Sequence, residues 1–304
     1  MRRWSASPDP AANTGWIDPP PRKGFFTDSS ICIGCKACEV ACKEWNGIPE
    51  DGLEMLGMSY DNTGALGAST WRHVAFIEQP RRPTGGQGFT ALPMVAAMPG
   101  QNAVQPSAAT GIRWLMSSDV CKHCTHAACL DVCPTGSLTR TEFGTVVIQD
   151  DICNGCGYCV PACPFGVIDR RQGPPGARNI GIAQKCTLCY DRLGEGMTPA
   201  CAQACPTQSI QYGDLDELRV RARHRVDELH AAGVTDARLY GADPHDGIGG
   251  AGAFFLLLDE PEVYGLSPDP VVTTRDLPAM WRTAAIAGAT LLAGAAMAFV
   301  RTRS

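Results

Sequence analysis

Residues 151–164 read D-I-C-N-G-C-G-Y-C-V-P-A-C-P, and this stretch decides how the rest of the chain is understood. Its cysteines are Cys153, Cys156, Cys159 and Cys163. In a C-x2-C-x2-C-x3-C-P run, the first three thiolates bind three irons of one iron–sulfur cube, whereas the fourth reaches a second cube. Gly155 and Gly157 allow the backbone to turn sharply beside the first cube. The stretch therefore predicts a partner run elsewhere in the chain.

The other cysteines follow the same grouping. The chain has 304 residues, 16 of them cysteines, which fall into four runs of four with none left over. The remaining runs are Cys32, Cys35, Cys38, Cys42; Cys121, Cys124, Cys129, Cys133; and Cys186, Cys189, Cys201, Cys205. The formal net charge is −5, which provides no basic field for nucleic acid. We therefore expect no nucleic-acid partner.

Disulfides and zinc are the alternative uses of so many cysteines. Disulfide frameworks occur mainly in small secreted domains. Four zinc sites of four thiolates would also use every cysteine, but structural zinc usually joins two separate C-x2-C loops. Three closely spaced cysteines with a fourth beyond them favour four [4Fe-4S] clusters, and a zinc-binding structural scaffold is the alternative. Because no cysteine is left over, covalent catalysis by a cysteine has no support in the sequence.

The second and third runs form an internal repeat, with only 20 positions from Cys133 to Cys153. This short linker predicts one compact two-cluster module of the bacterial-ferredoxin type, at about 119–170. The first and fourth runs then pair with each other around it. Counting leaves open the pairing of run one with two and of three with four, but the short linker favours the nested arrangement.

In each pair of runs, the fourth cysteine of one run binds the cluster held by the other run. This rule predicts four sets of iron ligands. They are the first set, Cys32, Cys35, Cys38 and Cys205; the second set, Cys42, Cys186, Cys189 and Cys201; the third set, Cys121, Cys124, Cys129 and Cys163; and the fourth set, Cys133, Cys153, Cys156 and Cys159.

An α+β fold is expected around these sets, within a double ferredoxin-like region at 25–214. A strand at 25–28 leads into the first run, and an insertion at 47–118 follows it. The insertion contains candidate strands at 71–78 and 112–116, joined through a Gly/Ala/Pro-rich loop at 80–110. We expect these strands to pair as an antiparallel surface hairpin. Nothing in them indicates chemistry, so we interpret the hairpin as a contact element for a partner protein.

Within the inner module, residues 135–140 predict a short helix, Gly144 a turn and residues 145–148 a strand. The segment after Pro164 repeats the sequence pattern and also predicts a helix.

The segment at 215–278 is expected to be peripheral. It contains an amphipathic helix at 215–230 that ends near Gly233, and short strands at 237–240 and 254–258.

Residues 1–24 are rich in Pro, Ser and Asp and predict a surface tail. Arg2 and Arg3 are not followed by an apolar segment, so no signal peptide is predicted.

The C-terminal segment, 279–304, has a different character. Thr283–Val300 contains no charged residue and is followed by the short basic tail R-T-R-S. At about 1.5 Å per residue, this length approaches the ~30 Å hydrocarbon core of a bilayer. The segment therefore predicts a transmembrane helix in contact with membrane lipid, with an Ala-rich soluble helix as the alternative. Thr290, Gly294 and Ala298 form a small-residue series that favours packing against a neighbouring membrane helix.

Several basic residues lie beside cysteines. Lys36, Lys43, Lys122 and Lys185 could raise cluster potentials or could be ordinary surface lysines, and the sequence does not separate the two. His123 and His126 are expected to lie near the ligands or to be exposed, because every set already has four thiols.

The chain resembles a known family at further positions. The segment Cys32–Asn46, C-I-G-C-K-A-C-E-V-A-C-K-E-W-N, together with Y-D-N at 60–62 and S-T-W at 69–71, resembles the iron–sulfur beta subunit of membrane-bound formate dehydrogenase. The wider family comprises the four-cluster subunits of molybdenum and tungsten oxidoreductases. The resemblance extends from about residue 25 to the C-terminus. The Pro-rich N-terminus and the loop at 80–110 depart from it.

This resemblance implies a relay that binds no substrate itself, so the chain is not expected to be an enzyme on its own. Formate would be oxidised in a separate catalytic subunit with a Mo- or W-pterin. The electrons would pass through four [4Fe-4S] clusters to an integral membrane subunit that reduces quinone, such as a cytochrome b-type subunit. It implies that the runs pair one with four and two with three. It also implies a single-pass protein of the cell (inner) membrane with its cluster domain on the outer face. The charge count is neutral and leaves the cytoplasmic face open. The same relay in a hydrogenase, or in a dimethyl sulfoxide or polysulfide reductase, is the alternative.

Overall fold

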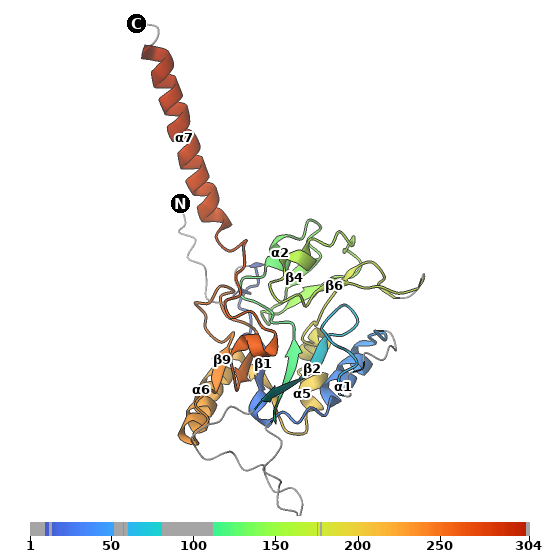
Figure 1. The fold of residues 1–304 in the computed structure, drawn as a ribbon. Helices are drawn as coiled ribbons and strands as arrows, with labels where there is room; N and C mark the ends of the chain where they lie inside the picture. Colours follow the sequence, from blue (N-terminus) through green and yellow to red (C-terminus); the bar gives the residue numbers. More distant parts are fainter. Residues whose placement is uncertain are drawn as a thin grey trace, which may run out of the picture.

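The structure is a computed structural model with a mixed α and β body and one long projecting helix (Figure 1). It describes residues 10–11, 14–51, 57, 60–80, 112–174, 176 and 178–301. Most of the loop predicted at 80–110 and parts of the tail predicted at 1–24 lie outside the described residues, as does nearly all of the basic tail.

A four-stranded sheet forms the centre of the body, in the order β8-β1-β10-β9. Its strands are β1 (Lys23–Asp28), β8 (Ile210–Asp214), β9 (Arg238–Tyr240) and β10 (Ala253–Leu257). Every residue of β10 is buried, as its continuous apolar run A-F-F-L-L predicts for a strand covered on both faces. The predicted strands are present, and the segment expected as peripheral supplies a central strand. Residues almost 230 positions apart thus lie side by side, with Phe26 paired to Phe254.

Helix α6 (Leu215–Ala231) packs against this sheet. Leu215, Leu218, Ala222 and Leu229 are buried along it, at the three- and four-residue spacing of an amphipathic helix. Gly233 follows the helix with a φ of 87° and donates its N–H to the carbonyl of His230. The predicted helix and its C-terminal glycine are confirmed.

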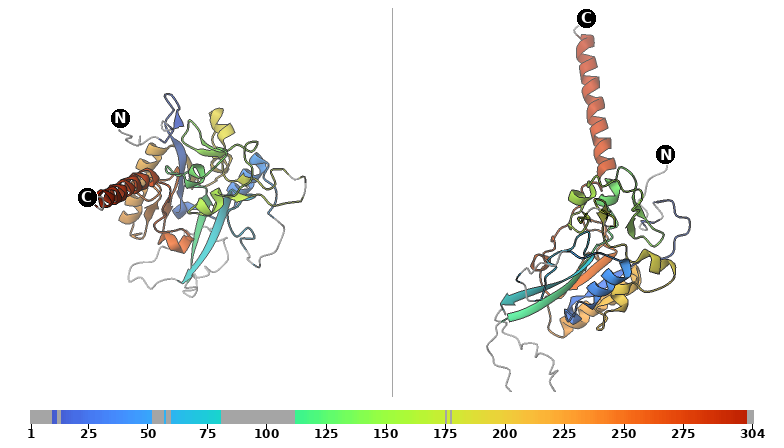
Figure 2. Two further views of the ribbon diagram at one scale, coloured as in Figure 1. Left: turned by 90° about the horizontal axis from the view of Figure 1, so that it is seen from above. Right: turned by 90° about the vertical axis from the view of Figure 1, so that its right-hand side faces the viewer.

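The insertion forms the hairpin of β2 (Arg72–Pro80) and β3 (Ile112–Val120). The antiparallel register runs from Arg72 opposite Val120 to Pro80 opposite Ile112, so the predicted pairing is confirmed. Figure 2 shows these two long strands extending from the body. The expected surface position is wrong at the base, where Arg72, Val74 and Val120 are each 1% exposed. Only the far end is a surface, because Ile112 and Trp114 are exposed there.

Two small sheets lie in the inner module: β4 (Leu138–Arg140) with β5 (Val146–Ile148), and β6 (Asp169–Arg170) with β7 (Ala183–Gln184). The helix predicted at 135–140 is wrong, because Leu138–Arg140 pairs with β5 through the turn that ends at Gly144. The helix predicted after Pro164 is also wrong, since that segment leads into β6. Gly136 and Gly166 have positive φ angles of 69° and 62°, which interrupt a right-handed helix before it can begin.

Short helices carry or flank the cysteines. They are α1 (Ala37–Asn46), α2 (Ala128–Asp131), α3 (Cys159–Ala162), α4 (Tyr190–Gly194) and α5 (Ala200–Gln203), with 3-10 turns η2 (Ser29–Ile31) and η3 (Pro261–Tyr264). Helices α1 and α5 lie against each other, so the first and fourth cysteine runs, more than 140 residues apart in the sequence, meet in space.

The C-terminal helix α7 (Leu277–Arg301) extends away from the body in both views of Figure 2. Its apolar side chains Trp281, Leu291 and Leu292 are each more than 70% exposed. Among the residues that the structure describes, no helix combines the length and the apolar character needed to cross a membrane. The transmembrane helix predicted within 279–304 is therefore not confirmed.

Candidate metal centres

The first ligand set surrounds a cavity between the loop that follows η2, helix α1, the hairpin and the segment that leads into β8. Its four cysteines, Cys32, Cys35, Cys38 and Cys205, all line this cavity, together with Ser118 and Thr207. The Cys38 sulfur lies 3.3 Å from the Ser118 hydroxyl, and the Cys205 sulfur lies 3.7 Å from that of Thr207. Cys35 is exposed, whereas Cys38 is buried, so one side of this set faces solvent.

The second set is the most buried of the four. Cys42, Cys186, Cys189 and Cys201 are all buried, and the thiolates of the other three members help to raise the pKa of Cys42, after burial itself. The Asn46 amide donates to the Cys42 carbonyl at 2.8 Å and lies 3.8 and 4.0 Å from the sulfurs of Cys42 and Cys189. Four mutually close thiols in an apolar core form a site for a group that stabilises thiolates.

The third set lines a cavity in the inner module, formed by Cys121, Cys124, Cys129 and Cys163 with two buried lysines and Phe165. Burial raises the pKa of Cys129 to about 12 and that of Cys163 in the same direction, with the Cys121 thiolate adding to the effect on Cys163. Cys163 therefore lies with the second run and not with its own, as the crossing rule predicts.

The fourth set lines a cavity formed by Cys133, Cys153, Cys156 and Cys159 with Thr135 and Ser137. Burial alone would raise the pKa of Cys133, but hydrogen bonds from Ser137 and Thr135 outweigh it and lower the pKa to about 6. The two hydroxyls lie 3.3 and 3.6 Å from the sulfur. Cys156 is exposed, so the fourth set also has one side open to solvent.

Glycines shape the ligand loops. Gly155 and Gly157 have φ angles of 72° and 80°, which confirms the sharp backbone turns expected from the sequence. A Cβ at Gly155 would lie 2.4 Å from the carbonyl oxygen of Gly181, whereas one at Gly157 would meet only the Arg170 side chain at 3.3 Å. The loop of the fourth set therefore requires a glycine at 155 for both its conformation and its close approach to the neighbouring loop.

The four sets are electrostatic neighbours in succession, from the first to the fourth. Burial raises the pKa values of these cysteines most, and the negative charges of nearby thiolates also raise them. Some of these nearby thiolates belong to an adjacent set. Cys201 of the second set acts on Cys38 of the first. Cys121 of the third set acts on Cys186 of the second. Cys159 of the fourth set acts on Cys129 of the third. The first and fourth sets are thus the two ends.

The lysines beside the cysteines fall into two kinds. Lys122 and Lys185 are only 1% and 2% exposed, and both line the cavity of the third set. Lys36 pairs with Glu39 and Asp61 at 3.1 and 3.2 Å, and Lys43 pairs with Asp51 at 3.1 Å. Lys122 and Lys185 are therefore the lysines held in the interior beside cysteines, while Lys36 and Lys43 lie nearer the surface. Lys122 is also paired with a carboxylate, that of Asp119, whereas Lys185 donates to the backbone carbonyls of Val146 and Cys186.

His123 is buried at 2% exposure beside the third set. Its Nδ1 accepts the Val146 N–H at 3.1 Å, so the neutral ring carries its proton on Nε2. Burial and the charges of Lys185, Arg22 and Arg140 hold its pKa well below the usual range. His126 is half-buried, so the expectation for both histidines agrees with their positions.

Arg72 and Ser118 lie beside the first two sets and were not among the predicted site residues. The Arg72 Nη1 donates to the Ser118 hydroxyl at 3.0 Å, and that hydroxyl contacts the Cys38 sulfur. The signal available in the sequence was an arginine near the start of a predicted strand, W-R-H-V. The hairpin interpreted only as a contact element thus contributes to the centre of the molecule.

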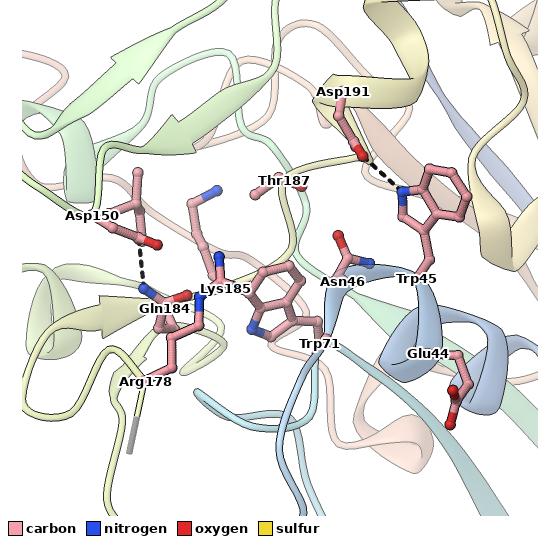
Figure 3. A pocket seen from close by; sticks show the side chains of 12 residues that line it. Glu44, Trp45, Asn46, Trp71, Asp150, Arg178, Gln184, Lys185, Thr187 and Asp191 are labelled. Atoms are coloured by element: carbon pink, nitrogen blue, oxygen red, sulfur yellow. Dashed lines mark hydrogen bonds between the residues drawn. The ribbon is translucent and has the colours of Figure 1, made fainter. Parts of the chain in front are cut away.

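A separate cavity of about 450 Å³ opens beside the second set. Figure 3 shows its lining, with Trp45 hydrogen-bonded to Asp191 on one side and Gln184 hydrogen-bonded to Asp150 on the other. Asn46 lines it and also contacts the cysteine sulfurs described above. This cavity is therefore a place where solvent approaches the second set.

The cysteine sets do not have the geometry of a mononuclear metal site. In the described part of the chain, no group of three or more His, Cys, Asp or Glu side chains is arranged to hold a single ion. The cysteines of the first, third and fourth sets instead line cavities, whereas a zinc site needs sulfurs converging at about 2.3 Å from one point. In each of these sets, four thiols surround a cavity. Buried N–H groups nearby lack hydrogen-bond partners, and this arrangement fits an anionic cluster.

Comparisons with known proteins agree with this chemistry. Residues 112–215 match a family model described as a 4Fe-4S dicluster domain, and residues 31–137 match a second model of the same description. The formate dehydrogenase iron-sulfur subunit of Haemophilus influenzae is 37% identical over 250 residues, covering 81% of this chain and 68% of that protein. The nitrate-inducible formate dehydrogenase iron-sulfur subunit of Escherichia coli is 36% identical over 81% of this chain and 73% of its own length.

A second group of relatives is also similar. The B subunit of the anaerobic dimethyl sulfoxide reductase of Escherichia coli is 34% identical over 64% of this chain and 75% of its own length. The fold and the cysteine sets define a ferredoxin-like iron–sulfur protein with two dicluster domains. The similarity to the first group covers more of the sequence, and the protein belongs to the family of formate dehydrogenase iron–sulfur subunits. The expected family is confirmed, and sixteen cysteines in two dicluster domains are consistent with four [4Fe-4S] clusters.

Proposed function

We propose that the chain is the electron-transfer subunit of a formate dehydrogenase complex, with each of the four ligand sets binding one [4Fe-4S] cluster. The succession of four neighbouring cysteine sets carries this proposal. When bound, each cluster supplies a one-electron carrier. The role of the chain is to hold these carriers in sequence, bury the second set completely and leave Cys35 and Cys156 exposed at the two ends.

The two ends are proposed to face different partners. The first set lies beside the hairpin, whose far end exposes Ile112 and Trp114, and this end is assigned to a catalytic subunit with a Mo- or W-pterin. The third and fourth sets lie in the part of the molecule nearest to α7 (Figure 1). Thr274, just before α7, donates to the Asp131 carboxylate of α2 at 2.5 Å. The fourth set is therefore assigned to a quinone-reducing membrane subunit.

Membrane attachment is part of the same proposal. The exposed apolar side chains of α7 need a partner of matching character, and a membrane-bound subunit with its surrounding lipid provides one. The charge pattern leaves the membrane face open, and the outer face follows from the resemblance alone.

The purified complex tests the proposal. We expect about sixteen irons and as many sulfides per chain, four for each of four cubes, and dye reduction driven by formate. Hydrogen serves as the control donor. Zinc without iron would contradict the relay, and activity with hydrogen but not with formate would assign the relay to a hydrogenase.

A second candidate is the same relay in a dimethyl sulfoxide reductase complex, because the B subunit of that enzyme is 34% identical over 75% of its length. In this complex the direction of electron flow through the relay would be reversed. The complex would then oxidise a reduced dye with dimethyl sulfoxide, and formate would not reduce the dye.

A further inference from the structure

In the part of the chain that the structure describes, Arg72 is a buried cation whose main electrostatic neighbours are cysteines and not carboxylates. Its side chain is 1% exposed, and Nη1 donates to the Ser118 carbonyl and hydroxyl at 3.3 and 3.0 Å. The Nε and Nη2 groups have no hydrogen-bond partner. An unpaired charge in a protein interior is penalised by several kcal/mol, so the fold should provide a counter-charge close to Arg72.

The surroundings of Arg72 identify that counter-charge. The guanidinium lies 5.0 Å from the Phe25 ring centroid, and Ser118 connects it to the Cys38 sulfur of the first set. Burial lowers the pKa of Arg72, but thiolate charges outweigh burial and raise it above the usual range. These charges come from the first and second sets; they are Cys201, Cys38, Cys186 and Cys42. Arg72 therefore lies between the two sets.

We propose that Arg72 is the shared counter-charge of the two clusters held by the first and second sets, and that it raises both reduction potentials. This inference rests on the proposed function. Reduction adds negative charge to each cluster, and a fixed cation stabilises the reduced form more than the oxidised form. The single charge of Arg72 acts on both neighbouring clusters, so the reduction midpoints of these two clusters shift in the same direction.

The guanidinium is suited to this position. It presents five N–H donors in a planar fork and stays charged at any physiological pH. Two of its nitrogens are without partners in the structure, so donors remain for sulfur on either side. A lysine could supply the charge but not donors in two fixed directions.

Four variants of the complete complex test the inference. Arg72→Leu and Arg72→Gln remove the charge, the second with a polar side chain that is easier to accommodate, and Arg72→Lys retains it. Arg171→Leu is the matched control, because Arg171 is 3% exposed, donates to the Ala68 carbonyl at 3.0 Å and has an unpartnered Nε. The charges acting on Arg171 are those of Asp150, Arg178 and Asp51, not of cysteines.

Iron and sulfide are measured first and cluster midpoints second, by potentiometric titration with EPR detection. About sixteen irons per copy of this chain in the parent complex, after the iron of its partner subunits is subtracted, establish the four clusters independently of Arg72, so failure of the proposed function is recognised at this stage. We expect the neutral variants to move two of the four midpoints to more negative potential. Arg72→Lys should recover most of the shift, and Arg171→Leu should move none.

Unchanged midpoints in a fully loaded neutral variant, or equal shifts of all four, would overturn the inference. If the neutral variants lose about eight irons, two cubes of four, recovery in Arg72→Lys supports the counter-charge. Loss that lysine does not repair would instead assign Arg72 a packing role. Ser118→Ala gives an independent check, because it interrupts the link to Cys38 and should lower one midpoint only.

Discussion

Cys163 is the residue that best distinguishes the predicted ligand sets from a simpler assignment of each run to its own cluster. It follows three cysteines of the third run in sequence but lines the cavity of Cys121 and Cys124. We expect Cys163→Ala to remove the cluster of the third set and to lower the iron content from about sixteen to about twelve per chain.

Double variants provide the control. Adding Cys124→Ala should cause no further loss, because both residues serve one cluster, whereas adding Cys153→Ala should lower the iron content to about eight. The reverse result, with Cys153 and Cys163 acting on one cluster, would show that each run holds its own cube. Iron analysis and spin quantitation of the reduced complex measure the difference.

Gly155 and Gly157 allow a comparison of what it costs in stability to add a side chain to a ligand loop. A left-handed conformation costs a non-glycine residue about 1–2 kcal/mol, so alanine at either position should lower the unfolding temperature. Gly155→Ala should be the more damaging change, because its Cβ meets the backbone of Gly181, while that of Gly157 meets a flexible arginine. Thermal unfolding and iron retention compare the two variants, and equal effects would show that the contact with Gly181 relaxes freely.

The cysteines could be assigned from the sequence because their signal is local: three ligands lie within seven residues, and each type of spacing implies a type of site. Arg72 could not be assigned, since its significance comes from cysteines as far away as Cys201. The same holds for Lys185, whose burial beside the third set depends on the path of β7. Local spacing predicts ligands, whereas the charges that tune them depend on tertiary packing.

Among the elements, α6 shows how apolar periodicity becomes stability. Leu218 is 1% exposed and belongs to a buried cluster that includes Phe26 and Phe254 of the sheet. Leu218→Ala should therefore reduce the free energy of unfolding by about 2–5 kcal/mol. Val220 lies two residues away and is 60% exposed.

Val220→Ala is the control on the same helix, with an expected change within about 0.5 kcal/mol. Denaturant unfolding followed by circular dichroism compares the two variants. Similar losses at both positions would mean that α6 is stabilised by its own helical propensity and not by packing against the sheet.

Elements with a strong apolar pattern were predicted with the correct type and approximate bounds. Strand β10 and helix α6 are examples, because one is continuously apolar and the other is periodic. The short strand β4 was not predicted: three residues, Leu138–Arg140, contain too little pattern to separate a strand from one helical turn. Its conformation is set by pairing with β5, which is information from outside the segment.

At the scale of the molecule, the central sheet closes the nested arrangement. Strand β1 leads into the first cysteine run, and its neighbour β8 follows the fourth run. Pairing β1 with β8 therefore brings these two runs together, while the inner module lies between them in the sequence. Helix α1 carries Cys38 of the first set and Cys42 of the second, so these two sets are adjacent within the closed arrangement.

Helix α7 gives the prediction that belongs to the whole molecule. It projects from the body (Figure 2), and none of the sixteen cysteines lies on it. A variant ending at Asp276 should therefore retain its clusters, with about sixteen irons, but lose its association with the membrane subunit and the membrane fraction.

A less drastic variant tests the apolar surface of α7 directly. Leu291→Glu with Leu292→Glu places two charges on the exposed helix, and an apolar partner would have to bury them at a penalty of several kcal/mol. Val220→Glu on α6 is the control, because Val220 is an exposed apolar residue on the body. We expect the α7 variant to separate from the membrane subunit during purification and the α6 variant to remain bound. If both remain bound, the hydrophilic body and not α7 makes the decisive contact, and the membrane subunit would then be held through the inner module around the fourth set.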